Sequence, residues 1–167
     1  KMEELVEKAM KDGAWGLATG LIYNPGTYSK TDELIALAKV AGKHGGHYAS
    51  HIRNEGTGLL DAIQEAMTIG KEGNCAVHIS HIKASGRAAY GLSARAVAMV
   101  ENARKSGQKV TADQYPYTAS STSLRATIVP TKYREGSTKE YVARYGDPQT
   151  GPKLKADLAE AIGERDN

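Results

Sequence analysis

Apolar and polar positions along the chain form two kinds of segment, which alternate with a repeat of about 30 residues. Between short apolar runs, hydrophobic residues recur at three- and four-residue spacing, as on one face of an α-helix. The runs predict strands at 14–22, 47–52, 76–82 and 109–115, and the spacing predicts helices at 2–13, 31–43, 58–71 and 92–105. In the helix at 31–43, Ser29 or Thr31 is placed to cap the N-terminus.

The strict order of strand and helix indicates an α/β fold with parallel strands, because a parallel pair needs a crossover that covers the sheet. Four such units are half of an eight-stranded barrel or a small doubly wound sheet. Loops after the strands carry the polar chemistry ("RNEGTG", "KASGRAAYG", "PYTASSTS"), whereas turns before them are short and rich in glycine ("HGG", "KSGQ"). This asymmetry favours a partial (β/α)8 TIM barrel with its site at the carboxyl ends of the strands.

The strand–helix repeat ends near residue 123. Beyond it the sequence predicts two helices, at 138–145 and 151–163, and no further strand. We therefore predict a partial barrel over residues 1–123 with strands of about the fourth to seventh positions, followed by a small helical insertion that begins at 124. No G-x-G-x-x-G motif follows any strand, which argues against a dinucleotide-binding sheet.

Composition excludes several classes of protein. The net charge of +3 comes from scattered lysines and arginines, which gives no basis for a nucleic-acid partner. No apolar run reaches the roughly 18 residues of a membrane span, and no signal-peptide pattern is present. The single cysteine, Cys75, excludes an internal disulfide and is expected to be a small buried side chain. These features predict a cytoplasmic protein, and both ends read as cuts within a longer chain.

Two histidines end neighbouring strand-like runs, His51 in "HYASHIRNEG" and His81 in "VHISHIKASG". The carboxyl ends of parallel strands lie at one rim of a barrel, so the two imidazoles are expected to meet there. Alternation along the strands puts His78 on the opposite face from His81, against the helices. Two such imidazoles can bind one Zn²⁺ at about 2.1 Å. The alternative is that both histidines are structural or exposed.

Five other residues lie near the same rim. Arg53 and Lys83 each follow one of the histidines by two positions, and they either bind a substrate carboxylate or remain solvated. Tyr115 and Ser121, after the last strand, carry hydroxyls that suit the same carboxylate or a structural hydrogen bond. Asp113 either orients a histidine or is a hydrogen-bonded carboxylate at the strand end.

With these residues, the chain resembles the N-acyl-D-amino-acid deacylases (D-aminoacylases) of the amidohydrolase superfamily. The resemblance rests on "GLATGLIYNPGTYSKTDELIALAKVA", "GGHYASHIRNEGTGLLDAIQEA", "VHISHIKASG" and "VTADQYPYTASSTSL". It implies a (β/α)8 barrel in which His51 and His81 bind zinc from strands five and six. It also implies that Tyr115 and Ser121 hold the α-carboxylate of an N-acyl-D-amino acid, with Lys83 near the acyl or side-chain end. The implied reaction is zinc-dependent hydrolysis to a carboxylate and a D-amino acid.

The sequence departs from the family pattern at several positions. The H-x-H of strand one and the metal-bridging cysteine are missing, and Cys75 does not correspond to that cysteine. The catalytic aspartate is expected beyond Asn167, and Asp113 does not take its role. We therefore expect an inactive fragment of the enzyme.

Two alternatives stay open. The first is a cyclic-amide hydrolase like dihydropyrimidinase, although "AWGLATGLI" lacks the carboxylated lysine of that branch. The second is a non-catalytic half-barrel, which is expected to self-associate through its open sheet edges.

Overall fold

The computed structural model describes residues 1–163, which divide into two compact units. The first unit is Lys1–Pro116 and the second begins at Tyr117. The division falls in the loop after the last strand, a few residues before the boundary at 123 that the sequence suggests. Each unit is described by itself below.

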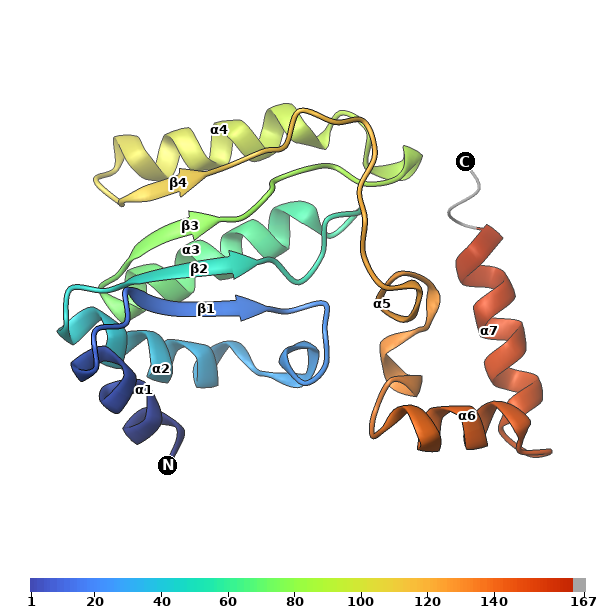
Figure 1. Cartoon of the computed structure of the whole chain (residues 1–167). Helices are drawn as coiled ribbons and strands as arrows, with labels where there is room; N and C mark the ends of the chain where they lie inside the picture. The colour runs from blue at the N-terminus through green and yellow to red at the C-terminus, as the bar shows by residue number, and fades with distance from the viewer. Residues whose placement is uncertain (164–167) are drawn as a thin grey trace. The chain divides into compact units, whose positions relative to one another are not determined.

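The first unit contains a four-stranded parallel sheet in the order β1-β2-β3-β4 (Figure 1). Every strand pairs in parallel with the next strand along the chain, and a helix connects each pair. The strands are β1 (Gly16–Gly20), β2 (His47–His51), β3 (Ala76–Ile79) and β4 (Val110–Ala112); the helices are α1 (Met2–Lys11), α2 (Thr31–Lys43), α3 (Leu59–Gly73) and α4 (Leu92–Lys105). The predicted α/β fold with four parallel strands is confirmed.

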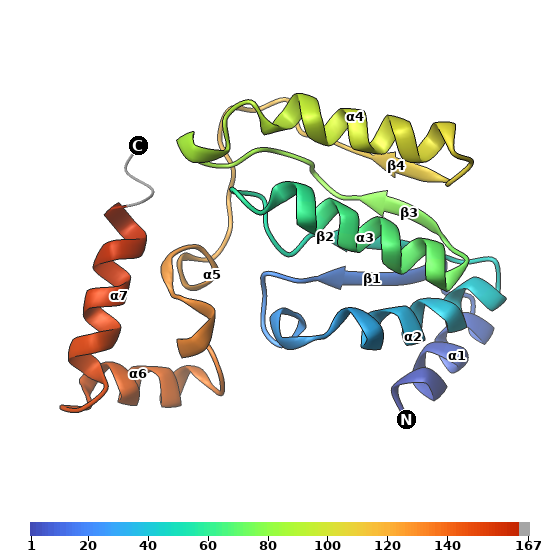
Figure 2. The same ribbon diagram turned by 180° about the vertical axis from the view of Figure 1, so that it is seen from behind.

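The core of this unit lies between the sheet and its helices. Helices α2 and α3 lie behind the strands in Figure 1 and in front of them in Figure 2, so they cover one face of the sheet. Tyr48, Val77 and Ile79 point into this layer and are at most 1% exposed. A methyl group added to Gly70 of α3 would lie 1.9 Å from a Val77 methyl carbon, so only glycine permits this approach of helix and strand.

The helices begin and end close to the predicted residues, but the strands are shorter. Helices α2 and α4 have the predicted bounds, whereas β3 ends at Ile79 instead of residue 82. Because Val77 and Ile79 face the helices, His78 lies on the other face of the sheet, where it contacts Thr111 of β4. The prediction that His78 packs against the helices is therefore wrong. The alternation that placed it there does not extend past Ile79, since His81 lies in a turn.

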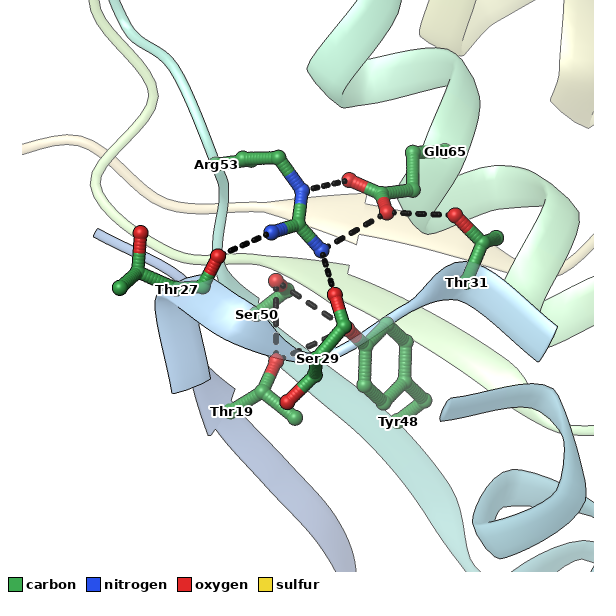
Figure 3. A network of polar contacts seen from close by, with 8 residues as sticks. All are labelled: Thr19, Thr27, Ser29, Thr31, Tyr48, Ser50, Arg53 and Glu65. Carbon is green, nitrogen blue, oxygen red and sulfur yellow. Dashed lines mark hydrogen bonds and ion pairs between the residues drawn. The ribbon is translucent and has the colours of Figure 1, made fainter. Parts of the chain in front are cut away.

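The predicted cap of α2 is also wrong. Lys30 is the N-cap residue and no side chain caps the helix. Thr31 instead donates its hydroxyl to a Glu65 carboxylate oxygen at 2.8 Å, as Figure 3 shows.

Arg53, in the loop after β2, shares Glu65 with Thr31 (Figure 3). Its guanidinium donates to both carboxylate oxygens of Glu65, at 2.9 and 3.0 Å. It also donates to the main-chain carbonyls of Thr27 and Ser29, at 3.1 and 2.9 Å. The ion pair therefore ties the loop after β1 and the loop after β2 to helix α3.

A second set of polar contacts crosses the helix-facing side of β1 and β2 in the same view. The Thr19 hydroxyl lies 2.8 Å from the Tyr48 hydroxyl and 3.2 Å from the Ser50 hydroxyl. Tyr48 and Ser50 are fully buried, and the hydroxyls of the three residues hydrogen-bond with one another. Burial raises the pKa of the Tyr48 phenol.

The second unit is helical over its described residues. It contains α5 (Leu124–Ile128), α6 (Thr138–Gly146) and α7 (Gly151–Gly163), with short 3-10 turns in both units at η1 (Gly26–Tyr28), η2 (Arg87–Ala89) and η3 (Thr131–Tyr133). The Ser137 hydroxyl and the Glu140 carboxylate form a capping box that begins α6. Helices α6 and α7 were predicted, whereas the five-residue α5 was not.

Among the described helices, none combines the length and the apolar character needed to cross a membrane.

The Arg53–Glu65 pair is expected to contribute more to stability than an exposed ion pair. Replacing Glu65 with glutamine leaves the partly buried guanidinium without a counter-charge, which should lower the free energy of unfolding by about 2–3 kcal/mol. The measurement is urea unfolding followed by circular dichroism at 222 nm. The control is Lys8→Gln, which removes an exposed pair with Asp12 and should cost less than about 1 kcal/mol. Equal effects of the two substitutions would contradict the assignment.

Candidate metal centre

Two imidazoles meet at the carboxyl ends of β2 and β3. His51 is the last residue of β2, and His81 lies two residues beyond the end of β3. Their ring centroids are 4.4 Å apart, with an angle of 71° between the ring planes. Tyr23, in the loop after β1, contacts the His51 ring edge-on at a centroid distance of 5.0 Å. The structure thus brings together the two histidines that the sequence selects, and adds an aromatic neighbour that sequence reasoning missed.

His81 has an unusual main-chain conformation and contacts Asp113, the residue after β4. Its φ angle of 40° lies in the left-handed region, which non-glycine residues seldom adopt. The Asp113 carboxylate accepts a hydrogen bond from the His81 main-chain N–H with one oxygen, and its other oxygen lies 3.1 Å from Nε2 of His78. The pKa of Asp113 is lowered, first by the hydrogen bond from His81 and then by His78. Asp113 therefore contacts two histidines, one through its ring and one through its main chain.

Glu55 is a third possible metal ligand beside the histidine pair. One ligand atom from each of His51, Glu55 and His81 lies within 4.8 Å of the other two. The nearer Glu55 oxygen is 3.1 Å from Nδ1 of His81. Sequence reasoning missed this residue. The only available signal was the position of a carboxylate in "RNEGTG", four residues after His51, and a single loop glutamate has no periodicity that marks it.

The Lys83 ammonium lies beside two of these ligand groups, Glu55 and His81. The ammonium donates to a Glu55 carboxylate oxygen and lies 2.9 Å from Nδ1 of His81. It also lies 5.4 Å from the centre of the Tyr115 ring. The ammonium thus pairs with two of the three possible ligand groups, so zinc binding there requires that Lys83 move away from them.

Two buried polar atoms in this region have no hydrogen-bond partner among the described residues, Nε2 of His51 and the hydroxyl of Tyr115. Burial is the main reason why the pKa of His51 is lowered, with the charges of His81 and Lys83 adding to it and Glu55 opposing it. The lowered pKa favours neutral imidazole, the form that binds metals. An unpartnered nitrogen beside a second imidazole and a carboxylate fits a Zn²⁺ site.

Of the other predicted site residues, Tyr115 lies beside the histidines, whereas Arg53 binds Glu65 and Ser121 lies in the second unit. The ring centroid of Tyr115 is 6.4 Å from that of His81. The Arg53 guanidinium is bound to Glu65 and to two main-chain carbonyls, so its contacts give no support to substrate binding. Ser121 belongs to the second unit, where it is exposed and outside regular secondary structure.

Cys75 is buried just before β3, and its thiol lies 3.1 Å from the Ala38 carbonyl oxygen. Burial raises the pKa of the thiol, so the reactive thiolate is disfavoured. Cys75 is thus the small buried side chain that the sequence predicts.

Comparison with curated proteins gives three relatives from Alcaligenes xylosoxydans xylosoxydans. An N-acyl-D-glutamate deacylase is 42% identical over 123 residues, a D-aminoacylase 40% over 124, and an N-acyl-D-aspartate deacylase 38% over 125. Each match covers 74% of this chain but only 25% of the relative, so the chain spans about a quarter of their length. No family model matches the sequence.

Solved structures agree with these matches. A D-aminoacylase crystal structure, described as defining a novel subset of amidohydrolases, superimposes with a TM-score of 0.71 at 34% identity, over 92% of this chain and 35% of that one. An N-acyl-D-glutamate deacylase from Bordetella bronchiseptica, solved with zinc and a phosphonate inhibitor, gives the same TM-score at 31% identity and covers 96% and 39%. The four strands and their helices therefore match part of an amidohydrolase barrel, and the chain is a homologue of part of the D-aminoacylases and N-acyl-D-amino-acid deacylases.

Proposed function

We propose that this chain supplies part of the zinc centre and substrate pocket of an enzyme that hydrolyses the amide bond of N-acyl-D-amino acids. The observation that carries the proposal is the contact between His51 and His81 at the carboxyl ends of two neighbouring parallel strands. The sequence identity to three deacylases of N-acyl-D-amino acids supports the choice of substrate. The solved deacylase with bound zinc supports the choice of metal.

His51 and His81 would hold the metal through neutral imidazole nitrogens, and Glu55 offers an oxygen donor beside them. A zinc ion bound there would acidify its water and polarise the amide carbonyl. Glu55 now accepts from the Lys83 ammonium, so release of this contact would free both groups. Lys83 would then be available for a substrate carboxylate, which needs a positive group with several donors.

Tyr115 would contribute the other substrate contact in the first unit. Its hydroxyl is buried and has no partner among the described residues, and its ring lies beside Lys83. A phenol O–H in that position suits a carboxylate oxygen, because the bond would satisfy a donor that is otherwise left unpaired. Hydrolysis adds water across the amide, so that the acyl group leaves as a carboxylate and the nitrogen as an amine.

The histidine pair is tested by zinc binding to the metal-free chain, titrated against a chromophoric chelator. We expect weak binding at one zinc per chain that His51→Ala and His81→Ala each abolish. The matched control is His44→Ala, because His44 lies in the turn before β2 and pairs with Glu7. Equal affinity in the wild-type chain and both site variants would overturn the proposed metal centre.

We also expect the 167-residue chain to bind zinc through His51 and His81 without catalysing hydrolysis. We assign no general base to any described residue, so zinc-loaded chain should release no amine from N-acyl-D-glutamate or N-acyl-D-aspartate above the rate without protein. The measurement is detection of free amine with the N-acyl-D-amino acid in excess. Turnover by wild-type chain that His51→Ala abolishes would show that the site is complete, contrary to our assignment of a partial centre.

A further inference from the structure

Asp113, the residue after β4, contacts β3 and the turn that follows β3. Its main-chain N–H donates to the carbonyl of Ile79, the last residue of β3, at 3.2 Å. Its own carbonyl accepts from the Ile82 N–H at 2.9 Å. Its carboxylate accepts from the main-chain N–H of His81 and contacts the His78 ring. Asp113 therefore holds the turn from Ile79 to Ile82 at both ends and at its centre.

This turn determines where the His81 ring lies. A strand continued past Ile79 would point successive side chains to alternate faces of the sheet. Instead, His81 adopts a left-handed φ of 40°, a conformation that persists only where surrounding groups hold it. The described structure offers such a group in the Asp113 carboxylate, which meets the N–H of that same residue. The left-handed residue sets the direction in which the imidazole leaves the main chain.

We propose that Asp113 is a positioning residue that holds the His81 imidazole toward His51 and Glu55 by binding the His81 main chain. This inference rests on the proposed function, in which His81 is a metal ligand. Carboxylates near metal sites usually orient a histidine by accepting from its second ring nitrogen. Here, Nδ1 of His81 faces Glu55 and Lys83, and Asp113 acts on the backbone of the residue instead.

The Asp113 carboxylate makes two contacts, with the His81 main chain and with the His78 ring, and three variants distinguish their effects. Asp113→Ala removes both contacts. Asp113→Asn keeps an oxygen that can accept from the His81 N–H, while it loses the negative charge. His78→Gln removes the ring contact and leaves the Asp113–His81 bond in place. The Asp113 side chain is 62% exposed, so these changes should leave the buried core intact.

The first readout needs no metal. In metal-free chain, amide hydrogen exchange of His81, measured by NMR, should accelerate roughly tenfold in Asp113→Ala, since a tenfold change corresponds to about 1.4 kcal/mol, the size of one hydrogen bond. Asp113→Asn and His78→Gln should stay close to wild type. If the alanine variant does not fold, Asp113→Glu takes its place, because its longer side chain moves the carboxylate away from the His81 N–H.

The second readout is zinc affinity, measured in the same variants. We expect a loss of about 10- to 100-fold in Asp113→Ala, and values near wild type in Asp113→Asn and His78→Gln. Unchanged His81 exchange and unchanged zinc affinity in Asp113→Ala would overturn the proposal. A loss in Asp113→Asn or in His78→Gln as large as that in Asp113→Ala would overturn it as well, because charge or the ring contact would then be responsible. If wild type binds no zinc, the proposed function fails, whereas the exchange measurement still tests the link from Asp113 to His81.

Discussion

The parallel pairing of β2 with β3 is the constraint on which the candidate site depends. This pairing places Ser50 beside Ile79, so the residues that follow the two strands start from the same rim of the sheet. His51 needs only to end its strand in order to reach that rim. His81 requires in addition a turn that leaves the strand after Ile79 and reverses the direction of its side chain. The position of His51 therefore follows from the sheet, and that of His81 from a turn that Asp113 contacts.

The stabilising contacts and the candidate metal centre use different faces of the same short segments. In the loop after β2, Arg53 points to Glu65 of α3 and fixes the loop, whereas Glu55 points to His81 and Lys83. The charged groups of the loop are thus divided between a structural ion pair and the site. This division explains how a glycine-containing loop can present a carboxylate to the histidines from a defined position.

Much of the fold can be predicted from the sequence, because helices repeat their apolar positions over several turns. The bounds of α2 and α4 follow from that repeat. Strand ends are harder to predict, because an alternation of apolar and polar residues over two or three positions occurs both inside a strand and just beyond its end. The end of β3 was therefore misplaced, and with it the face of His78.

The site itself was only partly predictable, for a similar physical reason. His51 and His81 could be found because they follow apolar runs at matching positions. Glu55 could not, because its role depends on the path of an irregular loop. Arg53 was expected at the rim, where it would bind a substrate carboxylate or remain solvated, but Glu65 of the following helix α3 binds its guanidinium. Such contacts depend on tertiary structure and leave no local pattern in the sequence.

The proposed metal centre requires that His51 and His81 bind one zinc ion together. X-ray absorption spectroscopy at the zinc edge tests it most directly, because imidazole ligands give a recognisable multiple-scattering pattern. For zinc-loaded wild-type chain, we expect two imidazole nitrogens at about 2.0–2.1 Å, with oxygens as the remaining ligands. A zinc coordination sphere with one imidazole or none would contradict the proposed metal centre.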